Sequence, residues 1–223
     1  MVNINKKTPP QSLIDYKRQQ KIHDKDLVGK DIFDDFKEKS DLRTSLIEEQ
    51  GYICAYCMQK IENDPLKCKI EHCISQDESS KKKLDYDNLL LCCKGNEGHK
   101  PVDQHCDTKK GEKSFHFNPS EQKYDMERLI QYNSQGKILS TDAELNDQLV
   151  QTLNLNFKML KMHRLGVLQE IERVLSKKKG TRTKSEIQKL INRWEALGSK
   201  GQHKPFYGVA VYKLKKHQSY CRA

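Results

Sequence analysis

The stretch CAYCMQKIENDPLKCKIEHC, residues 54–73, and the stretch DNLLLCCKGNEGHKPVDQHCDTKKG, residues 87–111, hold seven of the eight cysteines in this 223-residue chain. Cysteine gathered this densely requires a chemical reason: disulfide bonds, a bound metal, a reactive nucleophile or chance. The first stretch also contains Glu71 next to His72, and the second contains Asn88 before an apolar run. We therefore expect these two stretches to decide both fold and chemistry.

The chain as a whole is strongly basic. Its formal net charge is +10, with 32% charged and 35% hydrophobic residues. Such a surface favours a polyanionic partner, most often nucleic acid. Charge alone leaves a basic protein without such a partner equally open.

The N-terminal stretch MVNINKKTPPQSL contains no apolar core of the kind found in secretory signals. No run of the chain approaches the roughly 18 apolar residues of a membrane-spanning helix. We therefore expect a cytoplasmic protein with no membrane partner. Disulfides are disfavoured in that reducing compartment, where clustered cysteines more often bind metal or take part in redox chemistry.

Cys54 and Cys57 have the two-residue separation that lets one tight turn direct two thiolates at a single ion. Redox pairs share this spacing, so a zinc site needs further ligands. Four thiolates around zinc would stabilise a region with little apolar core. The second stretch offers Cys92, Cys93 and Cys106 as the remaining ligands. The other cysteines are expected to be ordinary buried thiols: Cys68, Cys73 and Cys221.

Local patterns around the cysteines predict both helix and strand. NKKTPP, residues 5–10, is expected to be an extended arm because its prolines exclude helix. SDLRTSLIEEQG, residues 40–51, predicts a helix that Ser40 or Asp41 caps and that ends near Gly51. In LKCKIEHCI, residues 66–74, apolar and polar residues alternate, which predicts a strand.

The C-terminal part of the chain has helical periodicity. One apolar stripe runs over residues 165–175 and another over residues 187–197, at spacings of three and four. Thr183 and Glu186 have the spacing of a capping box at the start of the second helix. The segment SKKKGTRTK between the stripes is expected to be a basic loop, and PFYGVAVYKLKK after them has a β-rich composition.

The reactive residues occur in a fixed order: C-x-x-C, Glu-His, Asn-Leu, a cysteine, and C-x-x-x-K. In this order the chain resembles the zinc-knuckle form of the HNH nucleases. The segments CAYC, IEH, DYDNLL, HCDTKKG and LNLNFKMLKMHR further resemble HNH proteins of the PtuB type, from retron and Septu antiphage systems. The resemblance covers most of the chain and is most specific in the motif region.

The resemblance implies an α+β fold, with a zinc-knuckle ββα-metal (HNH) finger embedded between mainly helical N- and C-terminal segments. It divides the chain into an N-terminal arm and helix (1–50), an HNH nuclease module (51–119) and a mainly helical C-terminal region (120–223). The third zinc cysteine of this family lies five positions after the asparagine, which selects Cys93 over Cys92. The implied structural zinc ligands are Cys54, Cys57, Cys93 and Cys106.

The resemblance also implies a catalytic centre. Glu71, which precedes the histidine, and Asp107, which follows the fourth cysteine, would bind a catalytic divalent ion, expected to be Mg²⁺. His72 would be the general base that activates water, since an ordinary histidine pKa of about 6.5 allows proton uptake near neutral pH. Asn88 would hydrogen-bond the backbone across the finger, and Lys110 would contact phosphate.

Three features depart from the usual motif. Glu71 stands where aspartate is commoner, and Asp107 stands where histidine or asparagine is usual, although a carboxylate suits a hard cation. Residues 94–105 form an insertion between the third and fourth zinc cysteines, where compact relatives have a far shorter link. Cys92 stays an alternative ligand for the knuckle. The insertion supplies three more rival ligands: His99, Asp103 and His105.

These features lead to one principal functional prediction and two alternatives. The principal prediction is a metal-dependent HNH endonuclease that acts in phage defence. The resemblance implies an ABC-type ATPase partner of the PtuA kind, in some systems with a retron reverse transcriptase and its RNA–DNA hybrid. The alternatives are a zinc-ribbon module that binds nucleic acid without chemistry, and an adaptor that recruits a partner. DNA and RNA, including tRNA, are both open as targets because such a finger contacts mainly backbone phosphates.

Overall fold

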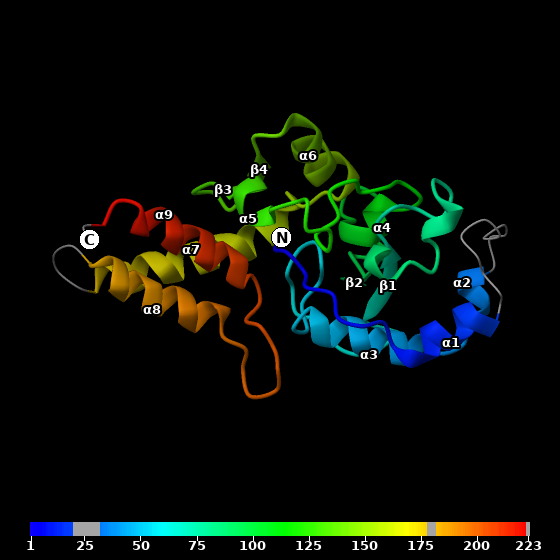
Figure 1. Cartoon of the computed structure of the whole chain (residues 1–223). Helices are drawn as coiled ribbons and strands as arrows, with labels where there is room; N and C mark the ends of the chain where they lie inside the picture. The colour runs from blue at the N-terminus through cyan, green and yellow to red at the C-terminus, as the bar shows by residue number, and fades with distance from the viewer. Residues whose placement is uncertain (20–31, 178–181, 222–223) are drawn as a thin grey trace.

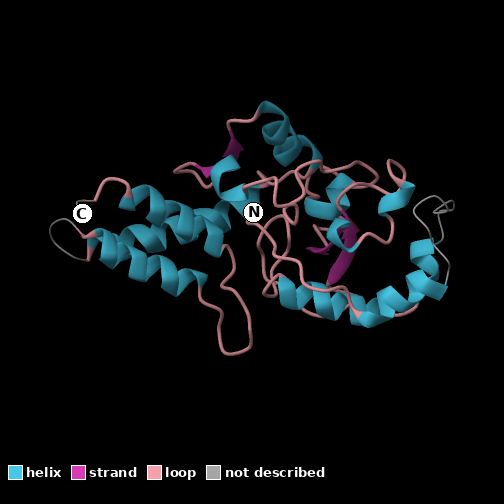
Figure 2. Cartoon of the chain, viewed as in Figure 1, coloured by secondary structure: helices cyan, strands magenta, loops and turns pink. Residues whose placement is uncertain are grey.

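The alternating stretch forms strand β1 (Cys68–His72), which pairs antiparallel with β2 (Leu89–Cys93). The computed structural model describes residues 1–19, 32–177 and 182–221. The predicted strand is therefore confirmed, and its register places His72 opposite Leu89. The short helix α4 (Cys106–Lys110) packs on β2, so the two strands and this helix lie together (Figure 2).

The segment between the two strands contains two short 3-10 turns. They are η1 (Ser80–Lys82) and η2 (Tyr86–Asn88), and the second leads directly into β2. The Asp85 side chain accepts a hydrogen bond from the backbone N–H of Asp87, which fixes the start of η2. This turn delivers Asn88 to the end of the hairpin.

In the described part of the first 50 residues, an arm without regular structure is followed by three helices. Residues 1–10 belong to no helix or strand, which agrees with the arm predicted for residues 5–10, and α1 (Gln11–Gln19) begins directly after the two prolines. The next helices are α2 (Ile32–Asp35) and α3 (Lys39–Glu49). The prediction that Ser40 or Asp41 caps α3 is wrong, because both residues lie inside its first turn. The N-cap residue is Glu38, and its side chain makes no capping hydrogen bond. Gly51 has φ +57°, which suits the glycine predicted to follow the helix.

A small hairpin that was not predicted from the sequence follows the cysteine-rich region. Helix α5 (Met126–Leu129) leads into β3 (Ile130–Tyr132), which pairs antiparallel with β4 (Ile138–Ser140). Helix α6 (Ala143–Asp147) then continues into the π-helical turn η3 (Gln148–Thr152). The described residues thus contain two separate two-stranded sheets in an α+β fold.

The C-terminal region forms three helices: α7 (Lys158–Ser176), α8 (Lys184–Glu195) and α9 (Tyr207–Gln218). The predicted stripes bury Leu168, Ile171, Ile187, Ile191 and Trp194. Figure 1 shows these helices side by side at one end of the molecule, with α1–α3 at the other.

Two details of the C-terminal prediction differ from the structure, and a third lies outside the described residues. Leu197 lies beyond the end of α8 and is 54% exposed, so it does not belong to the buried stripe. The β-rich segment PFYGVAVYKLKK contains most of helix α9, because its apolar residues at helical spacing pack against α7 and α8. Residues 178–181 of the predicted basic loop lie outside the described residues.

Apolar side chains are buried in two clusters. The larger cluster contains residues from Met1 to Val209 and so draws on all three predicted segments. The smaller cluster joins Ile171 of α7 to residues of α8 and α9. The segment boundaries at 50 and 119 stay a prediction. Within residues 1–19, 32–177 and 182–221, no helix combines the length and apolar character needed to cross a membrane.

Candidate functional site

The CAYC turn is anchored to the centre of β2. The buried Gln50 side chain donates to the carbonyl of Leu91 at 2.7 Å and accepts from its N–H at 2.8 Å. The N–H of Ala55 donates to the same carbonyl at 3.1 Å. The turn closes through a hydrogen bond from the N–H of Met58 to the carbonyl of Cys54. These bonds fix where the first two thiols stand relative to the strand that carries the third.

The four predicted zinc ligands converge. The sulfur atoms of Cys54, Cys57, Cys93 and Cys106 all lie within 4.8 Å of one another. The Sγ atoms of Cys54 and Cys106 are 3.9 Å apart, and those of Cys57 and Cys93 are 3.7 Å apart. A tetrahedron with Zn–S bonds of about 2.3 Å has S···S edges of about 3.8 Å. The cluster can therefore hold a zinc ion.

The pKa values of these thiols depend strongly on burial and on their neighbours. Burial raises the pKa of the Cys106 thiol well above its ordinary value, and the neighbouring thiols raise it further. The pKa of Cys54 is lowered instead, because the raising effect of its burial is outweighed by hydrogen bonds from the neighbouring thiols. Four thiols this close together cannot all ionise without a compensating cation. In the part of the chain that the structure describes, no other group of three or more histidine, cysteine or acidic side chains is as tight.

The remaining cysteines lie outside the group of four. The thiols of Cys68 and Cys73 donate to backbone carbonyls of Asp64 and Phe115, and Cys221 is buried in the smaller core. Cys92, the alternative for the third ligand, is buried on β2 but does not join the group.

The rival ligands of the insertion also lie outside the group of four. His105 comes closest, with Nδ1 3.2 Å from the sulfur of Cys106 and its ring stacked on Phe157. It is therefore a neighbour of the cluster. His99 is exposed, and Asp103 is half-buried.

A second set of polar side chains lines a cavity of about 150 Å³ beside β1 and α4. Glu71 and His72 come from the end of β1, and Asp107 and Lys110 come from α4. The Lys110 ammonium forms an ion pair with Glu71 Oε1 at 3.0 Å, and both side chains are almost fully buried. The structure therefore brings together four residues that the sequence placed in one catalytic centre.

The cavity brings two carboxyl groups, those of Glu71 and Asp107, close together. Burial raises the pKa of Glu71 well above its ordinary value, the nearby Asp107 carboxylate raises it further, and Lys110 opposes both. Lys69 contacts Asp107 at 3.7 Å but is shared with Glu97 at 2.5 Å. Two carboxylates held this close are a donor set that suits a hard divalent cation.

His72 is held in one orientation. Its Nε2 lies 2.9 Å from the carbonyl oxygen of Lys83, so Nε2 carries the hydrogen and Nδ1 is left as the acceptor. Phe33 packs edge-on against the His72 ring, with the two ring centroids 4.5 Å apart. Burial lowers the pKa of His72 to about 4, below the ordinary value expected from the sequence. The ring is therefore neutral at neutral pH, but it is a weaker base than an ordinary histidine.

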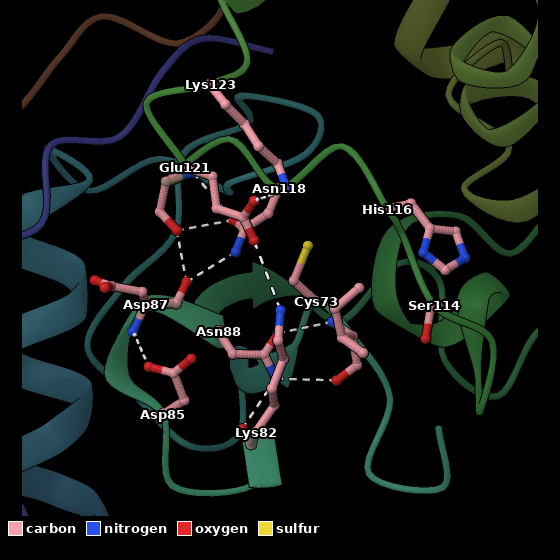
Figure 3. A network of polar contacts seen from close by, with 12 residues as sticks. Cys73, Lys82, Asp85, Asp87, Asn88, Ser114, His116, Asn118, Glu121 and Lys123 are labelled. Atoms are coloured by element: carbon pink, nitrogen blue, oxygen red, sulfur yellow. Dashed lines mark hydrogen bonds and ion pairs between the residues drawn. The ribbon is translucent and has the colours of Figure 1, made fainter. Parts of the chain in front are cut away.

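Asn88 clamps the backbone at the end of the hairpin (Figure 3). Its Oδ1 accepts from the N–H of Ile74 at 2.7 Å. Its Nδ2 donates to the carbonyls of Ile74 and Lys82 at 2.9 and 3.0 Å. The segment after His72 is thereby tied to the turn that precedes β2. Asn118 extends the network by donating to the carbonyl of Asp87 at 2.9 Å.

Two residues of the site were not predicted from the sequence. The Gln50 side chain hydrogen-bonds the backbone of Leu91 in β2, next to the CAYC turn. Tyr56, inside that turn, donates to Glu71 Oε1 at 3.1 Å. Only the position of Tyr56 between two zinc-type cysteines offered a signal. No family model matches the chain, and no curated protein is significantly similar to it in sequence.

Proposed function

We propose that this chain is a metal-dependent HNH-type endonuclease that hydrolyses phosphodiester bonds in nucleic acid. The observation that carries the proposal is the cavity that gathers Glu71, His72, Asp107 and Lys110 beside the four-cysteine cluster. The antiparallel strand pair followed by α4 supports a ββα finger, and the net charge of +10 supports a polyanionic substrate.

Each residue has a defined role in this proposal. Glu71 and Asp107 would hold a magnesium ion, which when bound supplies charge stabilisation at the phosphate and the leaving oxygen. His72 accepts a proton from the attacking water at Nδ1, because its Nε2 is already committed to the Lys83 carbonyl. Asn88 keeps the segment after His72 in place through its three backbone hydrogen bonds.

Lys110 has a different position from the one its proposed phosphate contact requires. It is buried, and its ammonium is bonded to Glu71 and to the carbonyls of Gly111 and Lys113. A cation bound by the two carboxylates would compete with this ion pair. The proposed phosphate contact therefore requires the Lys110 side chain to leave Glu71.

The proposed setting is an antiphage system. The resemblance to PtuB-type proteins supports an effector that works with a PtuA-type ATPase, and with a retron reverse transcriptase and its RNA–DNA hybrid where one is present. The competing proposal is a non-catalytic zinc module or adaptor. The buried, oriented His72 and the paired carboxylates favour the enzyme, because a binding module has no use for either.

The enzyme proposal is tested by His72→Ala, with His99→Ala as the matched control at an exposed histidine. Loss of a general base typically lowers the rate by roughly 10²–10⁴-fold. We expect that loss for His72→Ala, with zinc content and nucleic-acid binding retained, and parental cleavage for His99→Ala. The assay measures nicking of plasmid DNA and cleavage of tRNA with Mg²⁺, by the chain alone and with its ATPase.

Two outcomes would contradict the enzyme proposal. One is a His72→Ala variant that cuts at the parental rate. The other is a zinc-loaded wild-type chain that cuts neither nucleic acid under any of these conditions.

A further inference from the structure

Tyr56 lies inside the CAYC turn, between two of the four clustered cysteines, yet its side chain reaches the candidate active site. The hydroxyl donates to Glu71 Oε1 at 3.1 Å, and the side chain is fully buried. The turn that carries two thiols therefore also carries a contact to the carboxylate.

The contact selects one oxygen of Glu71. Lys110 Nζ lies 3.0 Å from the same Oε1 atom, so both donors gather on one side of the carboxylate. Within residues 1–19, 32–177 and 182–221, no nitrogen or hydroxyl donor bonds Oε2. Oε2 is therefore the Glu71 oxygen that neither Tyr56 nor Lys110 engages. The Asp107 side chain, which interacts with Glu71 directly, provides a second oxygen ligand for a cation.

The ring of Tyr56 has little freedom. Phe115 packs edge-on against it with ring centroids 5.4 Å apart, and Phe115 is itself fully buried. Phe115 is fixed in turn by a hydrogen bond from its N–H to the carbonyl of Cys73, directly after the Glu-His pair. At its other end, the Tyr56 backbone is set by the flanking Cys54 and Cys57.

We propose that Tyr56 is a positioning residue that couples the four-cysteine cluster to the cation site by holding the Glu71 carboxylate in its binding orientation. The inference rests on the proposed function for the identity of the cation site. The knuckle then has two roles, because it stabilises the fold and also orients the carboxylate. Without the hydroxyl, Lys110 alone would hold Oε1, and the carboxylate could rotate.

The test is Tyr56→Phe, which keeps the ring and its packing on Phe115 but removes the hydroxyl. The probe is Mn²⁺, whose binding to the zinc-loaded protein is followed by the loss of the free-ion electron paramagnetic resonance signal. Hydrogen bonds to charged groups are stronger than those between neutral groups, so we expect loss of the Tyr56 hydroxyl to weaken Mn²⁺ binding roughly 10-fold. Zinc content should stay unchanged, and Mg²⁺ at high concentration should largely restore the cleavage rate.

The matched control is Tyr86→Phe. The Tyr86 hydroxyl also donates to a glutamate, Glu49 Oε1 at 2.8 Å, but neither residue lines the cavity. This variant should bind Mn²⁺ as tightly as the wild type, and Glu71→Gln should abolish the binding. Parental Mn²⁺ affinity in Tyr56→Phe overturns the inference, as does loss of zinc, which would show a merely structural role.

The same measurements distinguish an error in the proposed function from an error in this inference. A wild-type chain that binds no Mn²⁺, with Glu71→Gln indistinguishable from it, removes the cation site and both proposals with it. Tight binding by both the wild type and Tyr56→Phe, abolished only by Glu71→Gln, leaves the nuclease proposal standing and removes the role of Tyr56.

Discussion

The cysteine-rich region and the α8–α9 pair differ in the kinds of side chain that they bury. Around the four clustered cysteines the structure buries polar and charged groups, including Glu71, Asn88 and Lys110, together with part of the larger apolar cluster. At the other end, two 12-residue helices bury a simple apolar stripe that includes Ile187 and Trp194 (Figure 1). The first region must satisfy each buried polar group in addition to burying apolar side chains, whereas the second buries mainly apolar side chains.

This contrast indicates where stability should be sensitive to chemistry and where to volume. A buried polar group that loses its partner is costly, whereas an apolar contact loses only in proportion to the atoms removed. Substitutions in the two regions should therefore differ both in the size and in the kind of their effects.

Cys93→Ser is expected to have the largest effect. It replaces one thiolate of the four-cysteine cluster by a neutral hydroxyl, and metal binding at such a site is part of folding. We expect zinc content, the free energy of unfolding and nuclease activity to fall together. The loss of stability should exceed the roughly 2–5 kcal/mol of an ordinary core truncation. Elemental analysis and thermal unfolding measure the two losses.

Cys92→Ser is the control for this prediction, because it makes the same atomic change at the adjacent buried position on β2. It should keep zinc, with a smaller loss of stability. The assignment of the knuckle is wrong if Cys92→Ser loses zinc while Cys93→Ser retains it. Treatment of the wild type with a zinc chelator should reproduce the Cys93→Ser phenotype.

Ile187→Ala tests the apolar end of the molecule. Ile187 is fully buried in the smaller core, so truncation should lower the free energy of unfolding by about 2–5 kcal/mol. Zinc content should remain that of the wild type, because the knuckle is built from other elements. Urea unfolding measures the change, and Leu197→Ala, at a 54% exposed position, is the control with almost no effect. Parallel loss of zinc in Ile187→Ala would show that the two regions are not separable.

The same contrast explains what the sequence could predict. The four clustered cysteines were predicted because their positions in a known motif order are readable from spacing. Strand β1 was predicted because apolar and polar residues alternate along it, although its burial does not alternate: Ile70 is half-buried, and Glu71 and His72 are both buried. Both signals are local or carried by fixed spacing.

The features that the sequence did not predict depend on tertiary contacts. The Tyr56–Glu71 hydrogen bond joins residues 15 positions apart, and nothing in either residue's neighbourhood indicates it. The β-rich composition of residues 205–216 was misleading because packing against α7 and α8 overrode local propensity. The β3–β4 hairpin is only three residues long on each side, too short to give a periodic signal.

The smallest predicted effect separates a real helix cap from an apparent one. Thr183 caps α8: its hydroxyl accepts from the N–H of Glu186 at 3.2 Å, and the Glu186 carboxylate accepts from the N–H of Thr183 at 2.9 Å. This confirms the predicted capping box, and Thr183→Ala should therefore cost about 1 kcal/mol. Ser40, whose sequence position suggested the same role, lies within α3 and caps nothing there. Ser40→Ala should be neutral or slightly stabilising, because alanine has the higher helix propensity. Chemical denaturation of the two variants measures both changes, and an equal loss in both would show that the hydroxyl of Thr183 does not act as a cap.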